Sequence, residues 1–266
     1  NREYLVDGTS PPSAREAQNV RRPRTAQVDV DGEAQITTLV HELGSDDLSL
    51  VCLFVSPMAD FSDVAREAAQ TFGNATVIAC TTAGEIGVQG YTGGHIVATA
   101  FPSASCATAT LDIRDLSNLD PQAQIDRIVQ ARSALAGSAP ALPNEFAFLM
   151  VDGLSMREDE LTAILASGLG PVPLCGGSAG DGTAFGKTQL AFGDTVLDDA
   201  ALLTLVRTSC PIRVFSLDHL VPTERRMVVT EADPSRRVVR QINAEPAAAE
   251  YARILGKDPA QLDQFT

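Results

Sequence analysis

The sequence has few basic residues and no long apolar run, and each shortage removes a class of function. Lys and Arg number 20 against 34 Asp and Glu, which gives a formal net charge of −14. An acidic chain repels nucleic acid and anionic membrane surfaces. No apolar stretch reaches the length of about 18 residues at which a helix can cross a bilayer. We therefore expect a protein that binds neither nucleic acid nor membrane.

Cysteine and histidine are also scarce, and their spacing matches no disulfide or zinc framework. The five cysteines form no CxxC pair and no zinc-like cluster with the three histidines. Cys52, Cys80 and Cys175 lie in apolar runs, which predicts small core residues whose burial suppresses the thiolate. Cys106 and Cys210 lie at the edges of predicted segments, so redox sensing by these two thiols remains an alternative function. Because the first residues also lack a signal-peptide pattern, the sequence indicates a reducing cytoplasm.

Apolar residues make up 44% of the 266 residues, which is enough for a globular core. Residues 1–30 depart from this pattern, because they hold three prolines and a basic cluster without any apolar period. We predict a flexible leader there, with an RNA-binding arm as the alternative. Helical spacing starts beyond Glu33 and runs to a stop signal at Gly44. The folded body is therefore expected to begin at residue 31.

The same order of elements occurs twice along the chain. An apolar strand, a helix and a strand that enters a small-residue turn are predicted at 48–56, 61–72 and 76–87 and again at 146–153, 158–169 and 172–182. A shift of 96 residues places Leu53 on Leu149 and Gly84 on Gly180 without a gap. The sequence therefore predicts an α/β fold, an internally duplicated unit with mixed sheets and flanking helices.

Further elements set the limits of the two repeats. Strands at 95–101 and 106–113 end the first repeat, at about 48–113, and a helix at 121–136 closes this unit. A strand, tight turn and strand end the second repeat, at about 145–207. One domain over 31–210 is expected to hold both.

A change of pattern at Pro211 predicts a partial second α+β domain over 211–266. Strands are expected at 212–219, 227–232 and 236–241, followed by a helix from Pro246. A domain that begins without finishing exposes apolar edges. Its strands are therefore expected to pair with another chain, as in a homodimer, or to be held poorly.

Five motifs, taken in order, resemble the FIST family of bacterial signal-sensing proteins: LFVSP (53–57), TTAGEIG (81–87), GGSAGDG (176–182), VVTEAD (228–233) and INAEPAAAEYARILG (242–256). The resemblance implies an intracellular, non-enzymatic input module that binds a small ligand and acts with signalling enzymes. It assigns residues 31–210 to a FIST N module and 211–266 to the start of a FIST C module. Since the second module of the family normally continues further, we expect a piece of a longer chain.

One segment, LDHLVPTERRMVVTEADPSRR at 217–237, is most similar to a haem-binding, nitric-oxide-sensing (NosP-type) branch of the family. This similarity implies haem as cofactor, His219 as the ligand of the haem iron and nitric oxide as the signal. The implied partner is a histidine kinase or a cyclic-di-GMP enzyme, either a diguanylate cyclase or a phosphodiesterase.

The three histidines differ in how well they suit haem iron, which needs an axial donor in an apolar cavity. His219 has apolar neighbours, although a hydrogen-bonded histidine at a strand end explains it equally well. His41 is expected on a helix surface. His95 follows a glycine-rich segment and starts a strand, where a structural role is the simpler interpretation.

The two turns form the other candidate site, a small-metabolite site in which glycine lets a ligand approach the backbone. Tight crossing of the chain between the repeats is the structural alternative. Neither turn carries the Walker lysine or the GxGxxG spacing of a phosphate cradle. The predicted ligand-binding residues are Thr82, Gly84, Glu85, Gly177, Ser178, Gly180 and Asp181.

Residues 176–180 also fit the GxSxG pattern of a nucleophile elbow, with Ser178 as nucleophile. Asp198 or Asp199, followed by His219, satisfies the chain order of a triad. The equivalent turn TTAGE of the first repeat has no serine, which favours an architectural role for both turns. We therefore expect no enzymatic activity and keep a serine hydrolase as an alternative.

Overall fold

The computed structural model describes residues 22–44, 47–87, 90–216 and 220–262. Contacts divide the chain between Val214 and Phe215 into a large and a small unit, four residues beyond the predicted limit at residue 210. Within these ranges, no helix is both long enough and apolar enough to cross a membrane. The fold class is confirmed: the chain is α/β, with mixed sheets and flanking helices.

The first half of the large unit builds a mixed sheet from β1 (Arg24–Asp29), β2 (Leu48–Val55), β3 (Thr76–Thr81) and β6 (His95–Pro102). Its helices are α2 (Gln35–Leu43) and α3 (Phe61–Thr71). The strand order is β1-β6-β2-β3, in which only β2 and β3 run parallel. Along the chain, β3 is followed by β4 (Glu85–Gly87) and β5 (Gly90–Thr92), which pair with each other as a hairpin before β6 begins.

The second half repeats this arrangement with β7 (Cys106–Arg114), β8 (Asn144–Val151), β9 (Leu174–Ser178) and β12 (Ala200–Thr208). Its helices are α4 (Pro121–Ser138) and α5 (Glu158–Leu169), preceded by the short 3-10 helix η1 (Leu116–Asn118). The strand order β7-β12-β8-β9 corresponds to β1-β6-β2-β3, and again only the last two strands run parallel. The predicted duplication is therefore present in the topology as well as in the turns.

The limits of the two repeats differ from the predicted ones. Strand β7 pairs with β12 along its whole length and therefore belongs to the second sheet. Helix α4, which follows β7, packs against this second sheet. The repeats therefore run from β1 to β6 and from β7 to β12, instead of 48–113 and 145–207. The predicted leader also ends earlier, because β1 pairs with β6 over Arg24–Asp29. Residues 1–21 lie outside the described ranges.

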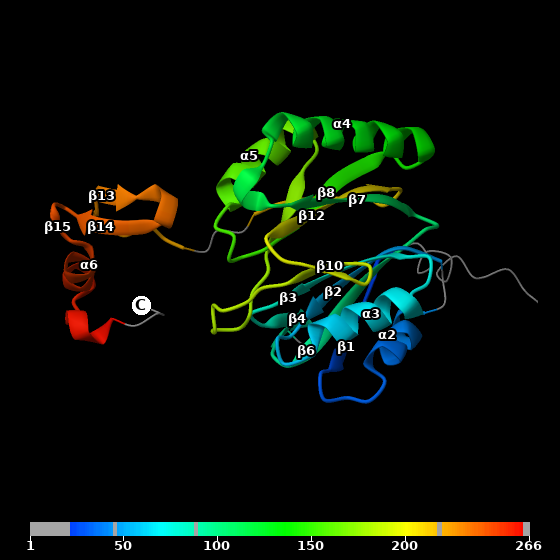
Figure 1. Cartoon of the computed structure of the whole chain (residues 1–266), viewed down its shortest axis with the longest axis horizontal. Helices are drawn as coiled ribbons and strands as arrows, with labels where there is room; N and C mark the ends of the chain where they lie inside the picture. Colours follow the sequence, from blue (N-terminus) through cyan, green and yellow to red (C-terminus); the bar gives the residue numbers. More distant parts are fainter. Residues whose placement is uncertain (1–21, 45–46, 88–89, 217–219, 263–266) are drawn as a thin grey trace, which may run out of the picture. The chain divides into compact units, whose positions relative to one another are not determined.

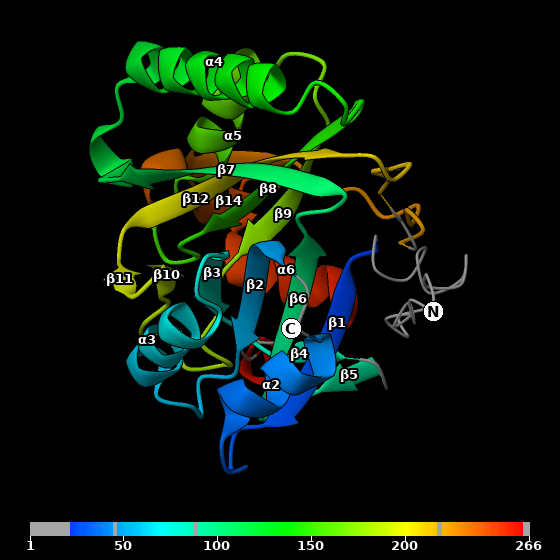
Figure 2. The ribbon, with the colours of Figure 1, turned by 90° about the vertical axis from the view of Figure 1, so that its right-hand side faces the viewer.

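The large unit has four layers, with the two sheets inside and the helices outside (Figures 1 and 2). Helices α2 and α3 cover the first sheet, and α4 and α5 cover the second. Asp60 and Asp120 cap α3 and α4, each accepting a backbone N–H at 3.1 Å. A third apolar cluster, including Leu50, Ile78 and Met150, fills part of the space between the sheets. This double coverage explains the apolar runs without alternation in β2 and β8.

A hairpin crosses from the second repeat to the first sheet. Strand β10 (Leu190–Phe192), which forms a hairpin with β11 (Thr195–Leu197), pairs with β3. The equivalent hairpin of the first repeat, β4–β5, pairs only within itself in the part of the chain that the structure describes. This asymmetry leaves β9 as the last strand of its sheet, with Gly177 and Ser178 exposed.

The small unit consists of an antiparallel sheet and a helix. Its elements are β13 (Val229–Asp233), β14 (Val238–Ile242), β15 (Glu245–Pro246) and α6 (Ala247–Leu255), with 3-10 helices η2 (Pro234–Arg236) and η3 (Pro259–Gln261). The strand expected at 212–219 is not formed in its described part, 212–216. The remainder of that segment, including His219, lies outside the described residues. Pairing with another chain stays a prediction.

A polar cluster around Glu250 makes the small unit sensitive to acid. Arg253 donates to both carboxylate oxygens, at 2.6 and 2.7 Å, and the Asn243 side-chain amide donates at 2.8 Å. These hydrogen bonds lower the pKa of Glu250 from 4.5 to about 2. Because the folded-state pKa lies below the unfolded one, the stabilisation is present above pH 4.5 and lost as the pH falls towards 2.

We expect Glu250→Gln to remove this part of the pH dependence. Hydrogen exchange of the α6 amides, measured between pH 5 and pH 2, should show a steeper loss of protection in the wild-type chain than in Glu250→Gln. An equal loss in both chains would show that another group controls the acid response.

Candidate functional site

The two predicted turns lie side by side and are joined by backbone hydrogen bonds. The N–H of Gly180 donates to the carbonyl of Thr81, and that of Gly182 to the carbonyl of Thr82, both at 3.0 Å. A Cβ atom on Gly180 would lie 2.8 Å from that of Ala83. Gly180 is therefore needed for close packing of the turns. This agrees with the alternative that the small residues serve tight crossing of the chain between the repeats.

A cavity of about 400 Å³ lies between the turns, within the usual range for small-molecule sites. Four of the predicted ligand-binding residues line it, namely Thr82, Gly84, Gly177 and Ser178. The other lining residues are Phe54, Cys80, Thr81, Ala83, Phe148, Leu149, Met150 and Gly176. Phe54 and Phe148 were not among the predicted site residues, although their alternate positions on β2 and β8 place them on the inner faces of the sheets.

The cavity has a polar and an apolar side. Its polar side consists of the turn backbone and of short hydroxyl side chains, among them Thr81, whose hydroxyl accepts the N–H of Gln189 at 3.0 Å. Phe54 and Phe148 stand on its apolar side, with ring centroids 6.4 Å apart and an interplanar angle of 82°. Such an arrangement suits a ligand with one polar and one apolar end.

Glu85 lies in an adjoining cavity of about 300 Å³, which shares Phe54, Thr82 and Gly84 with the first. The Glu85 side chain is buried, with 2% of the residue exposed. Its carboxylate accepts the Thr82 hydroxyl and, at 3.2 Å, the backbone N–H of His95. Both donors are neutral. Because a buried carboxylate is costly without an opposite charge, this site favours a cationic group on a ligand.

Asp181 corresponds to Glu85 in the other repeat but has a different role. Its carboxylate accepts the backbone N–H groups of Lys187, Gly186 and Phe185 at 2.8, 2.6 and 2.9 Å. These hydrogen bonds lower the pKa of Asp181 and close the loop after the turn on itself. Asp181 is not among the residues that line the three cavities around Phe54.

Ser178 lacks the setting of a nucleophile elbow. Its hydroxyl donates to a carboxylate oxygen of Glu158 at 3.2 Å. Strand β9 is followed by a loop and strand β10, whereas the elbow requires a helix directly after the nucleophile. The Asp199 carboxylate accepts the Ser117 hydroxyl at 3.3 Å, and His219 lies outside the described residues. The described geometry therefore does not support a triad.

His41, His95 and Cys80 are poorly placed to serve as axial donors to haem iron. His41 is exposed on α2, and His95 uses both ring nitrogens, with Asp29 at 2.9 Å and the Gly93 carbonyl at 3.0 Å. Burial raises the pKa of Cys80 to about 12, so the cysteine that lines the cavity stays a thiol. In the described ranges, no group of three His, Cys, Asp or Glu residues could hold a metal.

Three further cysteines, Cys52, Cys106 and Cys175, also favour a structural role. Burial raises the pKa of Cys52 and of Cys175. Cys106, expected at a segment edge, is buried, with its sulfur 3.5 Å from the Thr208 hydroxyl. Cys210 is partly exposed.

Comparison with known protein families gives a match that covers most of the chain. The chain matches the model of the FIST N domain over residues 49–245, a range that includes both turns and continues into the small unit as far as β15. The assignment of residues 211–266 to a second module therefore stays a prediction. A search of curated proteins gives no match. The matched range covers most of the sequence, and the chain belongs to the FIST N family of sensory, small-ligand-binding domains.

Proposed function

We propose that the chain is a sensory module for a small metabolite with an ammonium group, of the amino-acid type. The observation that carries this proposal is the cavity of about 400 Å³ that equivalent turns from both repeats line together. A ligand in this cavity contacts β3 and β9 at once. Its binding is therefore transmitted to both sheets through the turns.

The chemistry of the lining supports this ligand class. Backbone groups around Gly84 and Gly177 offer hydrogen bonds to a polar end, and glycine permits the close approach. The Glu85 carboxylate, in the adjoining cavity, supplies the negative charge that an ammonium group requires. Neither Lys nor Arg is among the residues that line these two cavities. A ligand whose only charge is negative is therefore disfavoured.

The output of the module is proposed to be a change in a partner signalling enzyme, a histidine kinase or a cyclic-di-GMP enzyme. The two turns hydrogen-bond to each other through Gly180 and Gly182, so a ligand between them competes with or reinforces these contacts. A shift between two arrangements of the turns needs only a ligand that binds one of them better.

A ligand screen tests this proposal. We expect one or more of the L-amino acids and the corresponding decarboxylated amines to raise the melting temperature, since a ligand at 100 times its Kd adds about 2.7 kcal/mol of stability. Gly177→Val, which puts bulk into the cavity at a position where a Cβ meets nothing within 4 Å, should abolish the shift. The proposal fails if no compound shifts the wild-type chain, or if Gly177→Val responds equally.

Haem-based sensing of nitric oxide is a second proposal, which rests on the sequence around His219 and not on the described cavities. Its test is the visible absorption spectrum after addition of ferric haem, reduction and nitric oxide. A haem band that responds to nitric oxide and is altered in His219→Ala would support it. An unchanged spectrum in His219→Ala would remove His219 as the iron ligand.

A further inference from the structure

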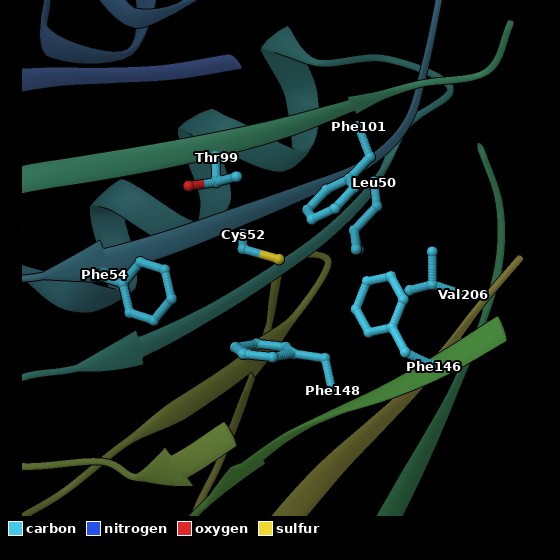
Figure 3. Close-up of a pocket in the computed structure, with 8 residues that line it drawn as sticks. All are labelled: Leu50, Cys52, Phe54, Thr99, Phe101, Phe146, Phe148 and Val206. Atoms are coloured by element: carbon cyan, nitrogen blue, oxygen red, sulfur yellow. The ribbon is translucent and has the colours of Figure 1, made fainter. Parts of the chain in front are cut away.

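A third cavity, of about 140 Å³, lies between the two sheets beside the turn cavity, the cavity of about 400 Å³ between the two turns (Figure 3). Its lining comes from the inner faces of β2, β6, β8 and β12 and is almost entirely apolar. The lining residues are Leu50, Cys52, Phe54, Thr99, Phe101, Phe146, Phe148 and Val206. We call this space the phenylalanine cavity, after its four aromatic side chains.

The phenylalanine cavity and the turn cavity meet at one pair of aromatic rings. Phe54 and Phe148 line both cavities and lie edge to face (Figure 3). Phe54 also lines the cavity of Glu85. Apolar, hydrogen-bonding and acidic surfaces therefore adjoin the same side chain.

The size and polarity of the phenylalanine cavity indicate what it can hold. An apolar cavity of about 150 Å³ remains dry and binds benzene. The phenylalanine cavity is of this size, and the Thr99 hydroxyl lies 3.3 Å from the hydroxyl of Thr25 on the neighbouring strand. Water would find few partners there, whereas a benzene-sized ring would make edge and face contacts with the surrounding rings.

We infer that the phenylalanine cavity takes a monocyclic aromatic ring carried by the ligand whose polar end lies at the turns. This inference rests on the proposed function and narrows the ligand to an aryl-bearing amine or amino acid. A short alkyl side chain leaves the cavity partly empty, and an indole, which is larger than a single ring, fits it less closely. Burial of the ring should raise affinity about ten- to hundredfold over the corresponding methyl compound.

Calorimetric titration of the full chain with L-phenylalanine, L-alanine and L-tryptophan tests the inference. We expect L-phenylalanine to bind most tightly. Thr99→Leu extends an aliphatic side chain into the phenylalanine cavity without touching the turns, and should weaken L-phenylalanine about tenfold while leaving L-alanine unchanged. Thr25→Leu is the matched control, because it removes the same hydroxyl contact from an exposed position outside the lining. It should bind like the wild type.

Phe146→Ala provides a test in the opposite direction, which holds even if Thr99→Leu folds poorly. Removal of this ring enlarges the phenylalanine cavity alone and should improve the binding of L-tryptophan relative to L-phenylalanine. The inference is wrong if wild-type affinity is equal for L-alanine and L-phenylalanine, or if neither variant changes the preference. Absence of binding for every amine in the screen would instead count against the proposed function.

Discussion

Replacement of Gly176 by Ala should destabilise the large unit by about 4 kcal/mol, from backbone strain and from steric overlap together. Gly176 has a φ of +149°, a conformation that residues with a side chain rarely adopt. A Cβ atom there would overlap the carbonyl oxygen of Leu149 and lie 2.7 Å from the Leu149 nitrogen. Both atoms belong to the backbone of β8, which pairs with β9, so no side chain can rotate to relieve the overlap.

The neighbouring glycine supplies the control. Gly177 lies on the same strand, yet a Cβ atom there would meet nothing within 4 Å. Gly177→Ala should therefore stay within about 0.5 kcal/mol of the wild type. Urea unfolding followed by circular dichroism measures both variants. Equal stability of the two would mean that β9 does not approach β8 as closely as the structure shows.

The duplicated core was predictable because its signals are local. Apolar runs without alternation predict strands that are covered on both faces, and β2 and β8 lie between a helix layer and a second sheet. A small-residue turn after β3 and another after β9 align at one constant shift. The equivalence of the two turns predicted that they flank a shared cleft. In the structure, Thr82 of one turn and Ser178 of the other line the same cavity.

Strand partners were not predictable because pairing is decided far away along the chain. Only a few residues separate β6 from β7, and proximity assigned both to the first repeat, yet β7 pairs with β12, about a hundred residues later. The pairing of β10 with β3 was not predictable for the same reason, because these strands are also about a hundred residues apart in the sequence. Alternative partners of similar apolar character could not be ranked without the register of the whole sheet.

Equal positions in the two repeats also hid different roles. Glu85 and Asp181 occupy equivalent positions in the two turns, and both were predicted to bind the ligand. Asp181 turns towards three backbone N–H groups of its own loop, whereas Glu85 is buried beside a cavity. The difference lies in the loop between Asp181 and Lys187, whose fold brings those N–H groups together.

Glu85→Gln should lower the affinity for an amine ligand about ten- to hundredfold, because a charge-assisted hydrogen bond contributes about 1.5–3 kcal/mol. Glutamine preserves the size of the side chain, and its amide oxygen can still accept the Thr82 hydroxyl or the His95 N–H. The substitution therefore removes the negative charge with little change of shape. Calorimetric titration with the tightest amine of the screen measures the loss.

Two controls separate the effect of charge from damage to the site. Asp181→Asn neutralises the equivalent carboxylate outside the cavities and should leave the affinity unchanged. A second ligand that lacks the amine and carries no charge, such as the corresponding neutral carboxamide, should bind no worse to Glu85→Gln than to the wild-type chain, since it makes no ion pair with Glu85. If both ligands weaken equally in Glu85→Gln, this carboxylate supports the turn and does not recognise the ligand. Weakening of the amine alone would assign Glu85 as its counter-ion and the TTAGE turn as the ammonium end of the site.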